Sequence, residues 1–190
     1  MKRRSALTAC AALAGISCAV LPTPAPAAGA PDLAALLRTG RCVLLLRHAQ
    51  TEPGIGDPPN YRLDQCHTQR NLSADGRAQS RRIGQWFKDR KLQAKAVQSS
   101  AWCRCKDTAE IAFGAYTVQP ALGSFFDDRS LEAGQTQALR AMLKAVPSGQ
   151  FEVWVSHQVN ITSLTGEVPA MGEGFIVSAQ GSVLARTRFE

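Results

Sequence analysis

Runs of apolar residues alternate along the chain with longer segments in which apolar side chains recur at helical spacing. Residues 42–46 are apolar without interruption, which is typical of a strand buried on both faces in a parallel sheet. Ser73 is a favourable N-cap for a helix that extends to about Arg90, in which Ile83 and Phe87 lie on one face. This alternation predicts a helix packed on a buried sheet.

The same pattern continues along the chain and supplies the remaining elements of the predicted fold. It predicts strands over residues 96–99, 116–118 and 151–156, helices over 32–37, 107–113 and 135–145, and a hairpin over 175–189 that turns near Gln180 and Gly181. Residues 51–71 are rich in Pro, Gly, Asp and Asn and predict a long loop. Strands separated by helices predict an α/β fold, a three-layer sandwich with a mostly parallel central sheet flanked by helices.

The first 28 residues have the pattern of a cleaved export signal. A basic start at residues 2–4 precedes an uncharged apolar stretch over 6–21, and small residues at 25–27 suit a cleavage site. The apolar stretch is interrupted by Gly15, Ser17 and Cys18 and is followed by three prolines, so we expect no stable membrane span. A lipoprotein signal ending at Cys10 is the alternative. The mature protein is therefore predicted to be periplasmic or secreted.

The remaining chain is long enough for one domain, which we place at residues 40–190. The chain has 22 basic residues, of which three leave with the signal, so 19 basic and 15 acidic residues remain, a net charge of +4. An excess this small and dispersed argues against nucleic acid as a partner. It is compatible with an anionic small-molecule substrate.

Four cysteines remain after removal of the signal, namely Cys42, Cys66, Cys103 and Cys105. They allow three complete pairings, between which the sequence does not choose. Cys66, Cys103 and Cys105 with His67 could be imagined as zinc ligands, but one residue between two cysteines is not the usual spacing. Because export favours oxidation, we predict a disulfide and no metal, with free thiols as the alternative. His67 is interpreted as structural.

Two histidines and two arginines follow predicted strands directly. His48 and Arg47 end the first strand, Arg104 comes just after the second, and His157 follows the last parallel one. Ligands in α/β folds bind beyond the carboxyl ends of the strands. Guanidinium groups suit bidentate capture of phosphate oxygens, and an imidazole can attack phosphorus as a nucleophile. Together these residues predict phosphoryl transfer through a phosphohistidine, although a strand-end histidine alone is more often a surface or core residue.

Four segments in chain order resemble motifs of the histidine phosphatase superfamily, whose fold is phosphoglycerate-mutase-like. Residues 46–51 resemble its Arg-His-Gly signature, and residues 99–109 resemble its second motif with a phosphate-binding arginine. Residues 155–158 are similar to its late strand-end histidine motif, and residues 71–79 to its Leu-Thr-x-x-Gly-x-x-Gln helix start. The resemblance extends over nearly the whole predicted domain.

The resemblance implies that His48 is the nucleophile and that Arg47, Arg104 and His157 form the phosphate pocket, without a cofactor. Thr51 is a further candidate, because its hydroxyl could donate to phosphate shortly after the nucleophile. Two departures from the motifs concern the pocket shape. Ala49 stands where the family usually has glycine, and Gln158 replaces the glycine common after the last histidine.

The leaving oxygen needs a proton, and a carboxylic acid is the expected donor. The segment after the third strand lies where the family commonly keeps its acid, and there we predict Asp128. Asp127 is the nearest alternative, followed by Glu132 and Glu52, while a solvated turn is the plain structural interpretation.

These residues predict an exported, metal-independent phosphomonoester hydrolase that acts through a phosphohistidine on His48. The expected partner is a small phosphorylated substrate, for which a sugar phosphate of the cell envelope is one candidate. The alternative is a noncatalytic phosphate- or phosphoglycan-binding module. A disulfide from Cys103 or Cys105 to Cys66 would tie the long loop to the phosphate-binding segment.

Overall fold

A six-stranded sheet forms the centre of the structure, a computed structural model that describes residues 32–54 and 56–189. The strands are arranged in the order β3-β2-β4-β1-β5-β6. They comprise β1 (Cys42–Arg47), β2 (Ala96–Ser99), β3 (Thr117–Val118), β4 (Phe151–Ser156), β5 (Gly174–Ser178) and β6 (Val183–Thr187). The first four are mutually parallel, and β5 and β6 add an antiparallel edge. The sheet is therefore mostly parallel, as predicted.

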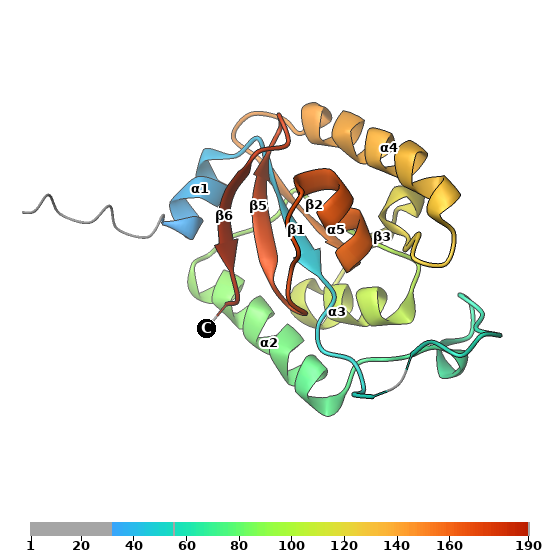
Figure 1. The fold of residues 1–190 in the computed structure, drawn as a ribbon. Helices are drawn as coiled ribbons and strands as arrows, with labels where there is room; N and C mark the ends of the chain where they lie inside the picture. The colour runs from blue at the N-terminus through green and yellow to red at the C-terminus, as the bar shows by residue number, and fades with distance from the viewer. Residues whose placement is uncertain (1–31, 55, 190) are drawn as a thin grey trace, which may run out of the picture. The chain divides into compact units, whose positions relative to one another are not determined.

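In the part of the chain that the structure describes, five α-helices pack around this sheet (Figure 1). They are α1 (Leu33–Thr39), α2 (Ala74–Asp89), α3 (Cys103–Phe113), α4 (Glu132–Ala145) and α5 (Gln158–Thr165). Helices α2 and α3 lie at the bottom of Figure 1 and α4 lies at the top, while α5 contributes to the same hydrophobic cluster as α4. Short 3-10 turns occur at Cys66–Thr68, Pro120–Leu122 and Arg129–Leu131. The three-layer α/β sandwich predicted from the sequence is confirmed.

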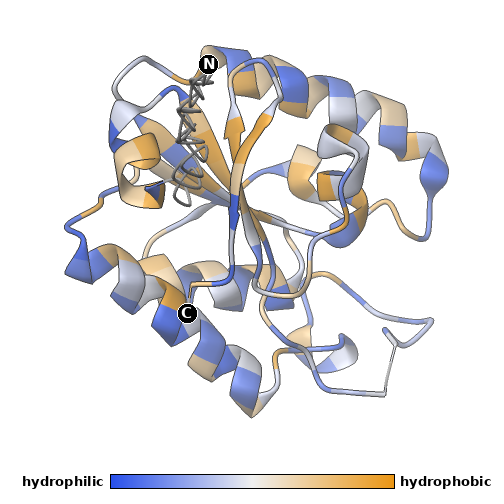
Figure 2. Cartoon of the chain, turned by 60° about the vertical axis from the view of Figure 1, so that its left-hand side comes forward, coloured by the Kyte–Doolittle hydropathy of each residue, from blue (hydrophilic) through white to orange (hydrophobic). Residues whose placement is uncertain are grey.

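Side chains of β1 alternate between two hydrophobic clusters, one on each face of the sheet. Leu44 and Leu46 pack with Ile83 and Phe87 of α2, while Leu45 packs with residues of α4 and α5 on the opposite face. The strands are strongly hydrophobic, whereas the helices carry hydrophilic residues on their outer faces (Figure 2). This two-sided burial explains why the strand reads as an unbroken apolar run.

The first helix lies before residue 40, where the predicted domain begins, yet it belongs to the same core. Asp32 caps its N-terminus by accepting hydrogen bonds from the backbone of Ala34 and Ala35, and Leu37 is fully buried. The predicted export signal lies outside the described residues. Within residues 32–54 and 56–189, no helix combines the length and hydrophobicity needed to cross a bilayer.

Helix α3 begins at Cys103, four residues before the predicted start, because its cap comes from a distant part of the chain. Trp102, the N-cap residue, makes no side-chain capping bond. The backbone N–H of Cys103 donates instead to Oε1 of Gln69 at 2.9 Å. A cap from a remote loop leaves no signal in the local sequence, which is why the predicted start was late. Because the helix begins at Cys103, Arg104 lies in its first turn and not in a loop.

Other elements match the predictions closely. Ser73 caps α2 by accepting a hydrogen bond from the backbone of Gly76, and the hairpin turns through Gln180 and Gly181. The helix predicted from residue 135 begins at Glu132, directly after a 3-10 turn. Helix α5 was not predicted.

Candidate active site

The two strand-end histidines meet because their strands are neighbours in the sheet. Strands β1 and β4 are parallel, and their register places Arg47 opposite Ser156. The backbone N–H of His48 donates to the carbonyl of Ser156 at 3.0 Å, and the ring centroids of His48 and His157 are 5.5 Å apart. The carboxyl edge of the sheet therefore presents both imidazoles to one site.

The ring of His48 is held with one nitrogen bonded to the backbone. Its Nδ1 lies 2.9 Å from the carbonyl oxygen of Ala49, which can only accept, so Nδ1 carries the proton and Nε2 keeps its lone pair. Burial, together with the positive charge of Arg104, holds the pKa of His48 well below its usual value of 6.5. The site therefore maintains a neutral imidazole suited to nucleophilic attack.

His157 is positioned by side chains from the start of α3. Its Nε2 lies 2.9 Å from Oγ of Ser100 and 3.4 Å from Sγ of Cys105. The edge of the ring packs against Trp102, with the centroids 5.9 Å apart. Burial, followed by the charges of Arg104 and His48, lowers its pKa well below the usual range. This histidine is thus fixed and neutral beside His48.

Three arginines converge on the histidines from three separate segments. Arg47 ends β1, Arg70 lies in the long loop, and Arg104 lies in the first turn of α3. The Nε atom of each is buried and has no hydrogen-bond partner among the described residues. Burial and the charges of the neighbouring guanidiniums lower the pKa of Arg47, and burial and Arg104 lower that of Arg70. Although Nη1 of Arg47 donates to the carbonyl of Pro169, the unpaired Nε–H groups and the mutual repulsion of the three cations favour binding of an anion.

A carboxylate from the long loop contacts the most buried of these arginines. Oδ1 of Asp57 lies 3.0 Å from Nη1 of Arg104 and accepts a hydrogen bond from the backbone N–H of Arg70 at 2.9 Å. The Arg104 side chain is 5% exposed and its guanidinium lies over the ring of Trp102 at 4.3 Å. The loop therefore reaches into the site and shares the central guanidinium.

These groups line a cavity of about 960 Å³. Its charged and aromatic inner residues are Arg47, His48, Arg70, Trp102, Arg104 and His157. Its outer part is lined by Tyr61, Ser124, Phe126, Asp127 and Arg129. The hydroxyl of Tyr61 donates to Asp127 at 3.2 Å and so joins the two outer segments. The cavity has a cationic base and a partly aromatic rim.

The structure brings four of the six predicted site residues together and leaves two apart. Arg47, His48, Arg104 and His157 line the cavity, whereas Thr51 and Asp128 do not. The Thr51 hydroxyl is buried and points to Sδ of Met171 at 3.7 Å.

Asp128 is engaged in local structure and does not line the cavity. Its carboxylate accepts hydrogen bonds from the backbone N–H and the hydroxyl of Ser130. Asp128 thereby caps the following 3-10 turn, and these bonds lower the pKa of its carboxyl group. A fully exposed carboxylate stabilised in its charged form is poorly suited to donate a proton to a buried site. Asp127, the nearest alternative, lines the cavity rim. The placement thus disfavours the prediction of Asp128 as the acid.

Sequence reasoning missed Asp57, Arg70 and Ser100. Arg70 directly precedes the predicted helix-start motif, and Ser100 lies inside the second motif. Their positions next to these motifs could therefore have indicated that they belong to the site. Asp57 is in a Pro- and Gly-rich stretch whose path no local pattern specifies. Only the folded loop places this carboxylate against Arg104.

The packing accounts for one departure from the motifs, Ala49, and for one motif glycine, Gly76. Ala49 is fully buried, and its backbone N–H donates to Oγ1 of Thr108 at 3.0 Å, which ties the segment after His48 to α3. At the start of α2, a Cβ at Gly76 would collide with the carbonyl of Gln50. The close approach therefore requires glycine at this motif position.

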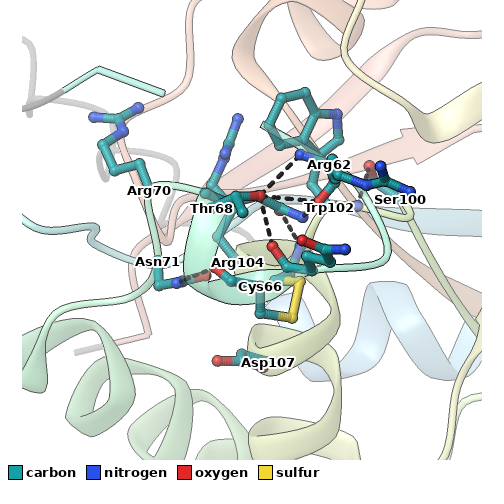
Figure 3. The surroundings of a disulfide bond; sticks show 12 residues. Arg62, Cys66, Thr68, Arg70, Asn71, Ser100, Trp102, Arg104 and Asp107 are labelled. Carbon is teal, nitrogen blue, oxygen red and sulfur yellow. Dashed lines mark hydrogen bonds between the residues drawn. A yellow bond between two sulfur atoms is a disulfide. The ribbon is translucent and has the colours of Figure 1, made fainter. Parts of the chain in front are cut away.

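A disulfide between Cys66 and Cys103 ties the long loop to α3 (Figure 3). It lies beside Arg104, and the amide of Asn71 donates to the carbonyl of Cys66 at 2.7 Å. Cys103 is thus the partner that the sequence left open. Cys42 and Cys105 are buried free thiols, and burial raises the pKa of Cys105 to about 12. Among the described residues, no group of His, Cys, Asp and Glu side chains is arranged to hold a metal ion.

Loss of this disulfide should destabilise the protein measurably. Reduction, or the double substitution Cys66→Ala and Cys103→Ala, should lower the free energy of unfolding by about 2–4 kcal/mol, because the bond restrains an otherwise flexible loop in the unfolded chain. Urea denaturation with and without a reductant measures the effect. The double variant is the control, since a reductant should not destabilise it further. An equal shift in wild type and double variant would contradict the assignment.

Comparison with solved structures supports the fold. A search of curated proteins found no match. The chain superposes on the protein histidine phosphatase SixA complexed with tungstate with a TM-score of 0.50 and 19% identity, covering 77% of this chain and 92% of that one. A phosphoglycerate mutase from Thermus thermophilus gives a TM-score of 0.53 at 19% identity, covering 76% and 97% respectively. At these identities the two structures support the fold alone.

The family assignment rests on the sequence match, which is much longer than any single motif. The model of the histidine phosphatase superfamily (branch 1) matches residues 43–167. That range contains both histidines and all three arginines of the cavity, and it extends over more than half of the chain. The chain therefore belongs to the histidine phosphatase superfamily.

Proposed function

We propose that this protein is a phosphomonoester hydrolase that needs no metal and acts through a phosphohistidine on His48. Membership of the superfamily supports phosphatase activity in general. The observation that carries the specific proposal is the set of three buried, unpartnered guanidinium Nε groups, among the described residues, around a neutral His48. They form a site with the charge and donors that a phosphoryl group requires.

In the proposed transfer each of these groups has a part. Nε2 of His48 attacks phosphorus while the ester oxygen leaves, and water then breaks the bond between Nε2 and phosphorus to release phosphate. Arg47, Arg70 and Arg104 offset the charge of the transferred group, and His157 donates to one of its oxygens. Ser100 positions His157 through the bond to Nε2.

The cavity suits a small substrate with a phosphate at one end. Its volume of about 960 Å³ is at the upper end of the usual range for small-molecule pockets of about 300–1,000 Å³. Phe126 is 69% exposed at the rim and offers an apolar surface for the leaving group. A sugar phosphate of the cell envelope remains one candidate. The disulfide supports an oxidising compartment such as the periplasm.

Phosphate release tests this proposal directly. The panel contains p-nitrophenyl phosphate, several sugar phosphates and, because a structural neighbour is a protein histidine phosphatase, phosphohistidine. We expect release that persists in EDTA. The second candidate, a noncatalytic phosphate- or phosphoglycan-binding module, predicts bound phosphate without turnover of any ester. Turnover that EDTA abolishes would contradict the metal-independent route.

The pH dependence should reflect the lowered pKa of His48. Because the folded protein keeps this imidazole neutral below 6.5, kcat should not decline between pH 7 and about 6, as it would for an ordinary histidine. The free energy of unfolding, in contrast to kcat, should change over this pH range. The unfolded chain takes up protons on His48 and His157 below about 6.5 and the folded chain does not, so the free energy of unfolding falls as the pH decreases.

Steady-state kinetics and urea denaturation over the same pH range measure both effects. A rise in stability on acidification, or a kcat that halves near pH 6.5, would contradict neutral histidines in the folded state. The comparison is made in EDTA so that adventitious metals contribute nothing. Thermal stability at each pH serves as the control for partial unfolding.

A further inference from the structure

Two carboxylates line the cavity, and they differ in depth. The Asp57 side chain is 18% exposed and contacts Nη1 of Arg104 at 3.0 Å. Asp127 lies at the exposed rim, where the hydroxyl of Tyr61 donates to it. A proton donor must lie within hydrogen-bond reach of the ester oxygen, so the deeper carboxylate has the better position.

We propose that Asp57 is the proton donor to the leaving oxygen, an inference that rests on the hydrolase function proposed above. Arg104 is the link. A phosphate oxygen bound to the guanidinium of Arg104 lies next to the carboxylate that contacts the same guanidinium. The hydrogen bond from the backbone of Arg70 fixes Oδ1 and leaves Oδ2 for the substrate. Asp57 thus reaches the scissile bond from the loop, whereas His48 approaches from the sheet edge.

The substrate itself supplies the proton. The second ionisation of a phosphate monoester occurs near pH 6, so much of the substrate arrives as the monoanion in mildly acidic solution. Binding moves Arg104 from the carboxylate to the phosphate, and the three guanidiniums favour the phosphate dianion. The proton of the monoanion therefore passes to the adjacent Asp57, which becomes a neutral carboxylic acid.

With this proton, both steps of the transfer proceed without a further reagent. As the bond from Nε2 of His48 to phosphorus forms, the bond from phosphorus to the ester oxygen breaks, and that oxygen takes the proton of Asp57 and leaves as an alcohol. In the second step the Asp57 carboxylate accepts a proton from the attacking water. The bond between Nε2 and phosphorus breaks, and phosphate departs.

The dependence on the leaving group distinguishes this role from a structural one. A p-nitrophenolate ion leaves without a proton, whereas the alkoxide of a sugar does not. Loss of a proton donor therefore slows the sugar phosphate and spares the nitrophenyl ester. A carboxylate that only holds Arg104 would affect both esters alike, because both use the same phosphate pocket.

The test compares Asp57→Asn with Asp64→Asn on p-nitrophenyl phosphate and glucose 6-phosphate. Asp64 lies in the same loop but outside the cavity lining, and it forms an exposed ion pair with Arg62. In Asp57→Asn the amide oxygen still accepts from the backbone of Arg70, so the loop is retained. We expect kcat on glucose 6-phosphate to fall about 10²–10⁴-fold in Asp57→Asn and on the nitrophenyl ester less than about tenfold. In Asp64→Asn, both rates should stay at the wild-type level, because an exposed ion pair of this kind contributes little.

Inhibition by inorganic phosphate provides a second measurement. Asp57→Asn should bind phosphate at least as tightly as wild type, because no carboxylate competes for Arg104. Equal losses on both esters, no loss on either, or weakened phosphate binding would overturn the assignment. A wild-type protein that releases phosphate from neither ester would instead refute the hydrolase function itself, so the two failures are distinguishable.

Discussion

Replacing His48 by alanine is expected to lower kcat by about 10⁴-fold or more, the scale seen when the nucleophile of a covalent mechanism is removed. The substitution deletes the only buried imidazole whose Nδ1 is bonded to the backbone and whose Nε2 is left free, among the residues that the structure describes. His157 cannot take over, since its Nε2 is engaged by Ser100. Initial rates of phosphate release in EDTA measure the loss.

Phosphate binding separates this prediction from simple unfolding. The three arginines are intact in His48→Ala, so isothermal titration with inorganic phosphate should still detect binding. His67→Ala is a matched control, because His67 lies in the loop outside the cavity lining and its loss should leave kcat unchanged. Full activity in His48→Ala would show that another group is the nucleophile.

The second large effect is expected for Arg104→Lys, which keeps the charge and removes the planar fork. Lysine has no planar group that could bind two phosphate oxygens with parallel donors while stacking on Trp102, over whose ring the guanidinium of Arg104 lies. We expect kcat/KM to fall about 10²–10³-fold, the range for loss of one transition-state donor. Inhibition by phosphate should weaken in parallel.

Arg77→Lys is the matched control for this substitution. Arg77 forms an exposed ion pair with Asp107 between α2 and α3, and such pairs contribute at most about 1 kcal/mol. Its replacement should leave kcat/KM and phosphate inhibition unchanged. If Arg104→Lys behaved in the same way, the guanidinium of Arg104 would not bind the transferred phosphate.

Local pattern predicted the fold well wherever burial alone decides the structure. The apolar run at β1 and the capped, one-sided helix α2 follow from packing on a two-sided sheet, and both have nearly the predicted bounds. The start of α3 was missed because its cap, Gln69, comes from a loop 34 residues earlier. Long-range hydrogen bonds of this kind have no periodic signature.

In the candidate site, too, residues placed by the sheet were predicted and residues placed by long-range contacts were missed. The two histidines and Arg47 could be predicted because parallel strands bring their carboxyl ends to one edge. Arg70 and Asp57 depend on the path of a long loop, which the disulfide and several single hydrogen bonds determine. For the acid, sequence position favoured Asp128, but the chain uses that carboxylate to cap a 3-10 turn.

Trapping the covalent intermediate tests the central claim most directly. Wild-type protein is mixed with p-nitrophenyl phosphate, quenched within milliseconds in alkali, where phosphohistidine is stable, and digested for mass spectrometry. We predict one added phosphoryl group on the peptide that contains His48, and none in His48→Ala. Turnover without any phosphorylated peptide, or with phosphate on His157 instead, would contradict the mechanism.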